Sequence, residues 1–299
     1  MITYNHENYI RSAIEGVLMQ KTAFKIELVI GEDCSTDDTR NICKEHEQKN
    51  PAVVKLLQSK VNLGMMLNTL RTLDACRGKY IAICEGDDYW TDSSKLQMQV
   101  DLLEANPDYG LVFTDASHYY EQNDTLIPAY DKTFRRKIPT GDVLPILLQG
   151  NNPYRTCTSM FRRSLIREYA GILTKHRFKM GDWVLWLFIA GQAKIGYLDH
   201  PTAVYRIREK SASHFDDLKK FVLFLKSSYQ ASIYFSDYYR QLVNRRKLKK
   251  NYRNSVLKYC VNQKQFKKLI EYSGCLPIAL VAIAKEKLRN LIIAARKHK

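Results

Sequence analysis

The amino-acid sequence predicts an α/β fold with a mostly parallel central sheet flanked by helices, followed by a helical C-terminal extension. Short apolar segments alternate with segments of helical periodicity over the first 115 residues, which is the order that crossover connections between parallel strands produce. From residue 215 onward the pattern is almost wholly helical and rich in lysine and arginine. We therefore divide the chain into a domain at residues 1–214 and an extension at residues 215–299.

The elements of the first 115 residues follow from their hydrophobic spacing. Ile10, Ile14 and Val17, for example, recur at the spacing of one helix face. The segment 1–4 reads as the end of a strand, and a central strand normally has about 5–6 residues, so we expect the start of this strand to be missing. The remaining expected strands are 24–30, 53–57, 80–84 and 109–115, and the expected helices are 9–20, 36–47, 63–76 and 95–105.

The pattern between residues 116 and 214 is less regular. We expect a polar loop at residues 150–158, helices at 140–148 and 180–190, and strands at 193–198 and 203–207.

Composition limits the class of protein and its compartment. The chain of 299 residues has seven cysteines and no Cys-x-x-Cys pair, which argues against a disulfide framework or a structural zinc site and favours a reducing compartment. The N-terminus lacks the regions of a secretory signal. The longest apolar run near the C-terminus, residues 276–284, is well short of the roughly 20 residues that span a bilayer. We expect a cytoplasmic protein without a transmembrane anchor.

Positive charge is concentrated in the extension. Residues 215–299 contain 20 Lys or Arg against five Asp or Glu, whereas the whole chain has a net charge of +16. A basic amphipathic pattern in residues 240–299 suggests contact with an anionic membrane surface at the inner face of the membrane. The alternative is a set of helices packed on the domain at residues 1–214 with a solvated basic face. No nucleic-acid partner is expected, because the extension matches no recognition module.

An acidic turn follows the apolar run at residues 80–83. Glu85, Asp87 and Asp88 lie within four residues, and Gly86 permits the bend. Carboxylates at the end of a buried strand repel each other and lose hydration, and carboxylate oxygens suit Mg²⁺ or Mn²⁺. The turn therefore predicts a site for a divalent cation that carries a phosphate, although a solvated acidic turn is the alternative for this motif taken alone.

Three other polar motifs also follow expected strands. Each alone could be a helix cap, but the ends of parallel strands meet at one edge of a sheet, where ligands bind. These motifs are Thr3-Tyr4-Asn5, Glu32-Asp33-Cys34-Ser35-Thr36-Asp37 and Asn62-Leu63-Gly64.

Together the four motifs resemble those of the family 2 glycosyltransferases, inverting enzymes with a GT-A fold that use nucleotide-diphosphate sugars. The resemblance covers roughly residues 1–214. The family usually has Asp-Asp-Gly-Ser-Thr where this chain has Glu32-Asp33-Cys34-Ser35-Thr36, and Asp-x-Asp where it has Glu85-Gly86-Asp87. Both changes keep the carboxylate.

The resemblance implies a donor site. Asp33 would accept a hydrogen bond from the imide N–H of a uracil-like base, and Glu85 would lie near the ribose. Asp87 would hold a Mg²⁺ or Mn²⁺ ion that bridges the two phosphates, with Asp88 supporting it. The rest of the implied donor set is Thr3, Tyr4, Asn5, Asn62, Gly64, Gly86, Arg206 and His214. Arg206 and His214 would contact the diphosphate, although Arg206 could instead be a surface charge on a strand.

The resemblance also implies an acceptor side and a catalytic base. Asp182, which begins an expected helix, matches the position of the base that takes the proton of the acceptor hydroxyl, but here Gly181 replaces the usual preceding Glu. Asp182 could instead merely cap that helix. Residues 152–162, with Thr156, resemble the acceptor-side segment. Trp183 and Trp186 are either a platform for a sugar ring or core residues.

The resulting hypothesis is an inverting hexosyl- or N-acetylhexosaminyl-transferase. It would move a sugar, expected from a UDP-sugar, to a hydroxyl of a glycan or lipid-linked acceptor in cell-surface polysaccharide synthesis. The alternatives are a non-catalytic GT-A-like domain that binds a nucleotide sugar and a peripheral membrane scaffold.

Overall fold

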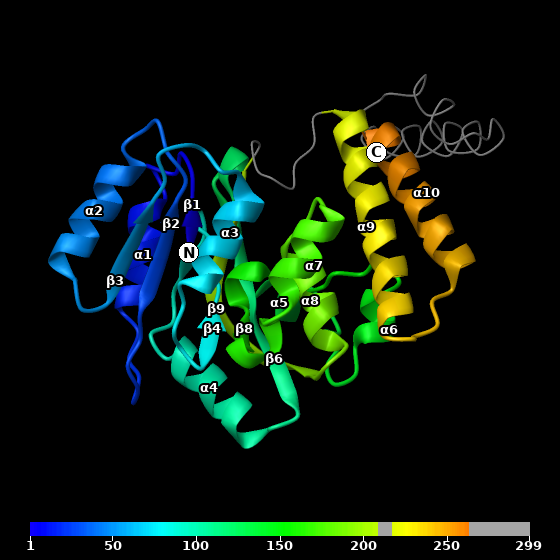
Figure 1. The fold of residues 1–299 in the computed structure, drawn as a ribbon, viewed down its shortest axis with the longest axis horizontal. Coiled ribbons are helices and arrows are strands. Elements are labelled where there is room, and N and C mark those ends of the chain that lie inside the picture. Colours follow the sequence, from blue (N-terminus) through cyan, green and yellow to red (C-terminus); the bar gives the residue numbers. More distant parts are fainter. Residues whose placement is uncertain (209–216, 263–299) are drawn as a thin grey trace, which may run out of the picture. The chain divides into compact units, whose positions relative to one another are not determined.

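A computed structural model describes residues 1–208 and 217–262 of the chain (Figure 1). It divides into two compact units, residues 1–147 with 151–214 and residues 148–150 with 215–299. The predicted domain assignment and the length of the first strand stay predictions.

The first sheet of the larger unit is parallel throughout, as the alternation of strands and helices predicts. Its three strands have the order β1-β2-β3, and helices α2 and α3 lie on opposite faces of it (Figure 1). The elements are β1 (Ile2–Thr3), α1 (Ile10–Leu18), β2 (Leu28–Glu32), α2 (Thr39–Lys49), β3 (Val54–Gln58) and α3 (Met65–Asp74).

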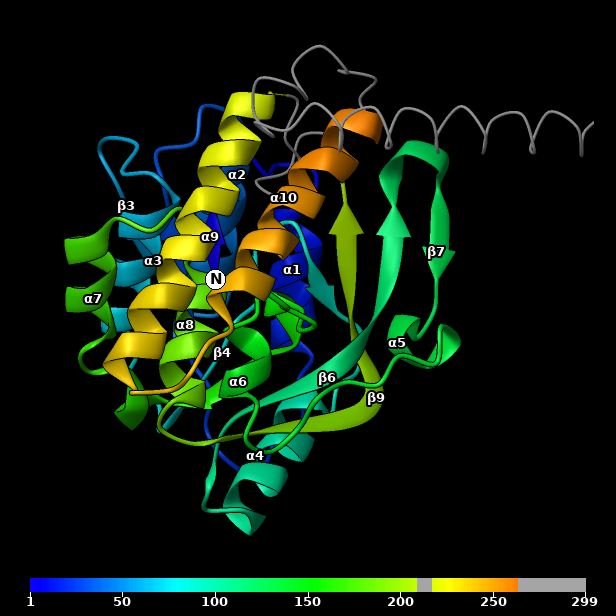
Figure 2. The ribbon, with the colours of Figure 1, turned by 90° about the vertical axis from the view of Figure 1, so that its right-hand side faces the viewer.

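The second sheet is mixed, so the prediction of a mostly parallel central sheet is wrong. Its strand order is β4-β8-β6-β9-β5, with β7 paired to β6, and of these pairings only β6 with β9 is parallel. Figure 2 shows β6, β7 and β9 side by side. The strands are β4 (Tyr80–Ala82), β5 (Tyr89–Trp90), β6 (Tyr109–Tyr120), β7 (Thr125–Ile127), β8 (Met160–Arg162) and β9 (Lys194–Ile207).

The sheet differs from the predicted parallel sheet because of strands in residues 116–214, where the hydrophobic pattern is irregular. β8 comes from that region and inserts antiparallel between β4 and β6, and β9 joins two segments that the sequence predicts as separate strands. The helices of this part are α4 (Lys95–Ala105), α5 (Tyr130–Thr133), α6 (Leu144–Leu147), α7 (Tyr169–His176) and α8 (Asp182–Ala190), with short 3₁₀ turns η1 (Glu121–Asn123), η2 (Thr156–Thr158) and η3 (Arg163–Ile166).

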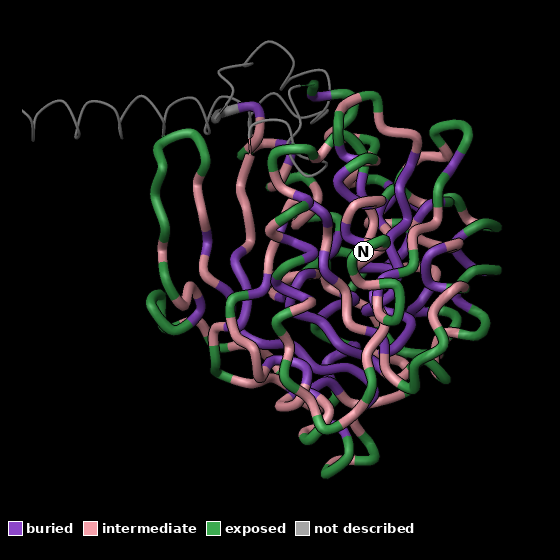
Figure 3. The backbone as a smooth tube through the Cα atoms, turned by 90° about the vertical axis from the view of Figure 1, so that its left-hand side faces the viewer, coloured by how far each residue is buried: buried purple, intermediate pink, exposed green. Residues whose placement is uncertain are grey.

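One hydrophobic core joins the two sheets. It contains Ile14 of α1, Ile30 of β2, Val112 of β6 and Met160 of β8. Figure 3 shows the buried segments of the backbone gathered in the interior. The backbone N–H of Gly86 also donates to Ile2 O at 3.0 Å. This bond brings the acidic turn against the end of β1.

The smaller unit is a pair of helices, α9 (Leu218–Tyr238) and α10 (Arg245–Asn262), which run antiparallel (Figure 1). Asp217 caps α9 by accepting from the backbone N–H groups of Lys219 and Lys220. Phe221 and Tyr259 stack between the helices, with ring centroids 4.4 Å apart. Residues 263–299, which include most of the predicted membrane-binding segment, lie outside the described residues. None of the helices described is both long enough and apolar enough to cross a membrane.

Candidate active site

Hydrogen bonds bring the ends of the first three strands together. Asn5, which follows β1, has a left-handed backbone with φ of 52°, and its Oδ1 accepts from Thr36 N at 2.9 Å. The carboxylate of Asp33, which follows β2, accepts from the backbone N–H groups of Leu63 and Gly64 at 2.8 and 2.9 Å. Three of the four predicted motifs are therefore linked directly to one another.

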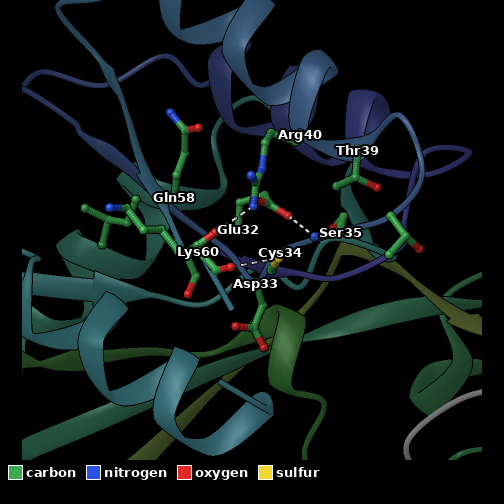
Figure 4. Close-up of polar contacts among 12 residues, drawn as sticks. Glu32, Asp33, Cys34, Ser35, Thr39, Arg40, Gln58 and Lys60 are labelled. Carbon is green, nitrogen blue, oxygen red and sulfur yellow. Dashed lines mark hydrogen bonds and ion pairs between the residues drawn. The ribbon is translucent and has the colours of Figure 1, made fainter. Parts of the chain in front are cut away.

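Glu32 and Asp33 have different surroundings although they are adjacent. The fully buried Glu32 carboxylate pairs with Arg40 Nε at 2.6 Å and accepts from Ser35 N at 2.6 Å. Asp33 points away from this pair toward the Leu63–Gly64 loop (Figure 4). Glu32 thus supports the turn from within, and Asp33 is the acid that faces the loop. Its role toward a nucleotide base stays a prediction.

Cys34 occupies the position where the family that this chain resembles usually has glycine. The backbone of Cys34 is left-handed, with φ of 62°. Glycine adopts this conformation at little cost, whereas a residue with a Cβ is strained. The Cys34 Sγ lies 3.5 Å from Lys60 O (Figure 4). Cysteine at this position therefore stores local strain that glycine would not.

The acidic turn is buried enough to perturb its acids. Burial, with the charges of Asp88, Asp87 and Asp182, raises the pKa of Glu85 well above its usual range. Burial and the neighbouring Asp87 raise the pKa of Asp88 to about 8, and the Asp88 carboxylate accepts from Arg206 N at 2.8 Å. Raised pKa values mean that the ionised carboxylates are destabilised at the turn, so added positive charge there would be favourable.

Two arginines of β9 and the segment after it supply part of that charge. Arg206 Nε donates to Asp87 O at 2.9 Å, and its guanidinium lies over the rings of three tyrosines at 4.8 to 5.4 Å from their centroids: Tyr9, Tyr89 and Tyr119. Arg208 Nη2 donates to the Asp87 carboxylate. The half-buried position of Arg206 beside the turn favours the site interpretation over that of a surface charge.

Unpaired polar atoms surround the same turn. The Thr3 Oγ1, His6 Nδ1 and Arg208 Nε atoms are buried without a hydrogen-bond partner. A Cβ at Gly86 would lie 2.7 Å from Thr3 Oγ1 and 2.9 Å from His6 Nδ1, so only glycine fits between them. Buried polar groups normally have partners, and three without one beside Asp87 fit the diphosphate of a bound nucleotide.

The residues present also fit a divalent cation that is shared with a ligand. Within the described residues, no group of three or more His, Cys, Asp or Glu side chains could hold a metal ion. Mg²⁺ commonly binds through one or two carboxylates together with substrate phosphates, and the carboxylate of Asp87 is half-buried at the centre of the turn. The carboxylate of Asp88 instead accepts a hydrogen bond from Arg206 N.

Asp182 lies at the start of α8, and its side chain takes part in a specific contact. Thr156 Oγ1 of η2 donates to Asp182 Oδ2 at 3.2 Å. Burial raises the pKa of the Asp182 carboxyl, and the backbone N–H of Trp183 and the Thr156 hydroxyl lower it by a smaller amount. Because Asp182 also contributes to the pKa shift of Glu85, the two carboxyls are within electrostatic reach of each other. The structure thus brings Thr156 into contact with Asp182, and Asp182 into electrostatic reach of the acidic turn.

The remaining predicted residues divide into surface, core and undescribed positions. Tyr4 and Asn62 are exposed. Trp183 and Trp186 are 5% and 0% exposed, and Trp186 packs edge-to-face on Phe113, which favours the core interpretation for both tryptophans. His214 lies outside the described residues.

Sequence reasoning missed Arg208, His6 and Lys95. Arg208 stands two residues after Arg206, so its side chain falls on the same face of the extended segment, a signal that could have identified it. His6 directly follows the Thr3-Tyr4-Asn5 motif. Lys95 is fully buried, and its Nζ donates to Gln99 Oε1 and, at 3.3 Å, to Thr158 O. The hydrophobic pattern of the helix at residues 95–105 does not indicate that this lysine is buried.

The chain belongs to the family described as Glycosyl transferase family 2. The model of this family matches residues 1–170. An uncharacterised protein of Mycobacterium tuberculosis is 33% identical over 222 residues, which are 74% of this chain and 62% of that protein. The dTDP-rhamnosyl transferase RfbG of Shigella flexneri is 24% identical over 221 residues, 71% of this chain and 72% of the relative. The chain thus spans less than two thirds of the length of the mycobacterial relative.

Solved structures share the fold. The TarS fragment 1–349 of S. aureus in complex with UDP-GlcNAc superposes with a TM-score of 0.56 at 18% identity, covering 77% of this chain and 64% of that one. The mannosyltransferase PcManGT of Pyrobaculum calidifontis in complex with GDP-Man and Mn²⁺ gives a TM-score of 0.57 at 15% identity, covering 97% and 79%. These matches confirm the GT-A fold.

Proposed function

We propose that the protein transfers a hexosyl or N-acetylhexosaminyl group from a nucleoside diphosphate, UDP in the first instance, to an acceptor hydroxyl with inversion at the sugar carbon. The observation that carries this proposal is Asp182, a half-buried carboxyl with a raised pKa that is bound to Thr156 and lies within electrostatic reach of the acidic turn. A carboxylate of raised pKa is a stronger base, which suits proton abstraction.

The chemistry divides between the two sides of the site. The acceptor oxygen attacks the anomeric carbon from the face opposite the diphosphate, and the bond between that carbon and the diphosphate oxygen breaks. The electron pair leaves with the diphosphate, and the hydroxyl proton passes to Asp182. Thr156 orients the carboxylate for this step.

The donor side would hold the nucleotide through Asp33, Asn5 and the backbone of the acidic turn. Arg206 and Arg208, which both contact Asp87, would stabilise the diphosphate as its charge develops. Asp87, supported by Asp88, would hold Mg²⁺ or Mn²⁺, which supplies Lewis-acid stabilisation of the leaving group. Support comes from PcManGT, whose structure contains GDP-Man and Mn²⁺, and from TarS with UDP-GlcNAc.

The acceptor that we propose is a glycan or lipid-linked sugar of a cell-surface polysaccharide, made at the inner face of the membrane. Support comes from the basic composition of residues 240–299, which suits an anionic surface. The alternatives are a GT-A-like domain that binds a nucleotide sugar without catalysis and a peripheral membrane scaffold.

Incubation of the purified protein with a panel of UDP-, GDP- and dTDP-sugars and Mn²⁺ tests this proposal, with release of the nucleoside diphosphate as the readout. We expect release from one class of donor, abolished by a chelator. Extracted membrane glycolipids are added as acceptors. Donor binding without release of the nucleoside diphosphate in their presence would instead support the non-catalytic alternative.

A further inference from the structure

Arg155, which directly precedes Thr156, is held in one orientation by uncharged partners. Its Nε lies 3.0 Å from His118 Nε2, and its Nη1 donates to Pro153 O at 3.0 Å. The guanidinium carbon lies 5.8 Å from the centroid of the Tyr130 ring. The side chain is therefore ordered in advance without any anionic contact.

His118 cannot neutralise this guanidinium. The imidazole is buried and stacks on Tyr130, with ring centroids 3.7 Å apart and an angle of 12°. Burial first, and then the nearby Arg155 and Arg136, lower the pKa of His118 to about 3, so it is neutral. Because His118 Nε2 accepts from Arg155, the ring proton is on Nδ1, which is buried and lacks a hydrogen-bond partner.

The nearby carboxylates are already engaged elsewhere. Asp131 pairs with Arg136 at 2.5 Å, and Asp115 accepts from the backbone N–H groups of Ala116, Asp131 and Lys132. In residues 1–208 and 217–262, no carboxylate lies within ion-pair distance of Arg155. Arg136, over the same Tyr130 ring, pairs directly with Asp131, whereas Arg155 acts on the Asp131 carboxylate only from beyond ion-pair distance.

A half-buried guanidinium without a direct ion pair is unfavourable, and its planar fork matches carboxylate and phosphate oxygens. Arg155 directly precedes Thr156, whose hydroxyl binds Asp182. The cluster of Arg155, His118 and Tyr130 is therefore joined through Arg155 to the same short segment as that contact. We propose that Arg155, with His118 and Tyr130, forms a subsite for an anionic group of the acceptor, a phosphate or a sugar carboxylate. The inference rests on the proposed function, in which Asp182 faces the acceptor.

Three alkyl glycosides that differ in charge test the subsite: an N-acetylglucosaminyl alkyl diphosphate, an alkyl glucuronide and an uncharged alkyl N-acetylglucosaminide. Their affinities for the full chain are measured by NMR titration, with UDP and Mn²⁺ present to fill the donor site and again without them. We expect the wild type to bind one anionic probe about tenfold more tightly than the uncharged one, which is the size of one charge-assisted hydrogen bond. Preference for the diphosphate identifies a lipid-linker phosphate, and preference for the glucuronide identifies an acidic sugar.

In the variant Arg155→Gln this preference is expected to disappear while the uncharged probe binds as before. Arg155→Lys is expected to keep part of the preference, and Arg77→Gln, which removes a surface charge, all of it. Equal binding of charged and uncharged probes by the wild type would overturn the proposal, as would a loss of both in Arg155→Gln. Failure to bind UDP would contradict the proposed donor, while the difference between wild type and Arg155→Gln, measured without nucleotide, would still report on the subsite.

Discussion

The Arg208 guanidinium pairs with the carboxylate of Asp87, the residue that we expect to hold the metal ion. The two side chains are 14% and 19% exposed, and Arg208 also lies 3.3 Å from His6 Nε2. The Arg208 guanidinium thus binds the Asp87 carboxylate, to which we expect a divalent cation to bind.

Arg208→Met is therefore expected to increase the affinity for Mn²⁺ in the absence of nucleotide, because the competing charge is removed. Measured ion pairs near a protein surface contribute up to about 1 kcal/mol, which corresponds to a several-fold change in affinity. Titration of Mn²⁺ followed by electron paramagnetic resonance measures this, and Asp87→Asn should lose the binding. Unchanged Mn²⁺ affinity in Arg208→Met would show that Arg208 does not compete.

Asp182→Asn is expected to lower the transfer rate by about a hundredfold or more, the usual contribution of a general base, because an amide cannot accept the proton. The affinity for UDP, measured by calorimetry, should stay at the wild-type value, since Asp182 is on the acceptor side. Wild-type turnover in this variant would rule out the assignment of the base.

Thr156→Val is expected to move the acidic limb of the profile of kcat/KM against pH to higher pH. The Thr156 hydroxyl helps to lower the pKa of Asp182, so its loss raises that pKa further. The base must be deprotonated to act, and a higher pKa therefore requires a higher pH. Thr156→Ser, which keeps the hydroxyl, is the control, and the prediction fails if both variants have the wild-type profile.

Cys34→Gly is expected to increase the free energy of unfolding by about 1 kcal/mol, because glycine relieves the strain of a left-handed backbone. Cys34→Val should decrease it, since a β-branched side chain is worse at this φ of 62°. Urea denaturation of the three proteins measures the effect. The opposite order would mean that the contact with Lys60 O outweighs the strain.

Lys95 makes stability depend on pH. Burial lowers its pKa to about 7 in the folded state, whereas the unfolded chain keeps the usual high value, so between these values the unfolded chain binds one more proton. The wild type should therefore gain stability relative to Lys95→Met as pH rises from about 7 to 10, by at most about 1.4 kcal/mol per pH unit. Denaturant midpoints at several pH values test this, and a difference that does not change with pH would show that Lys95 keeps its proton.

Much of the first half of the fold was predictable. The helix at residues 95–105 has the predicted bounds, and the strand predicted at 53–57 lies one residue further on, because regular spacing marks a helix face or a buried strand. The antiparallel insertion of β8 was not predictable, since three residues of strand within a polar region carry little pattern. The long β9 was divided in two because a short polar interruption reads as a turn.

The sequence by itself determined the family and the four polar motifs at the ends of strands, because these depend on residue types at short spacing. The tertiary structure decided what each side chain does there. It pairs Glu32 with Arg40 and directs Asp33 to the Leu63–Gly64 loop, and it sets Arg208 against Asp87 across 121 residues of chain. Such contacts depend on strand order and on which face each side chain takes, and local spacing specifies neither.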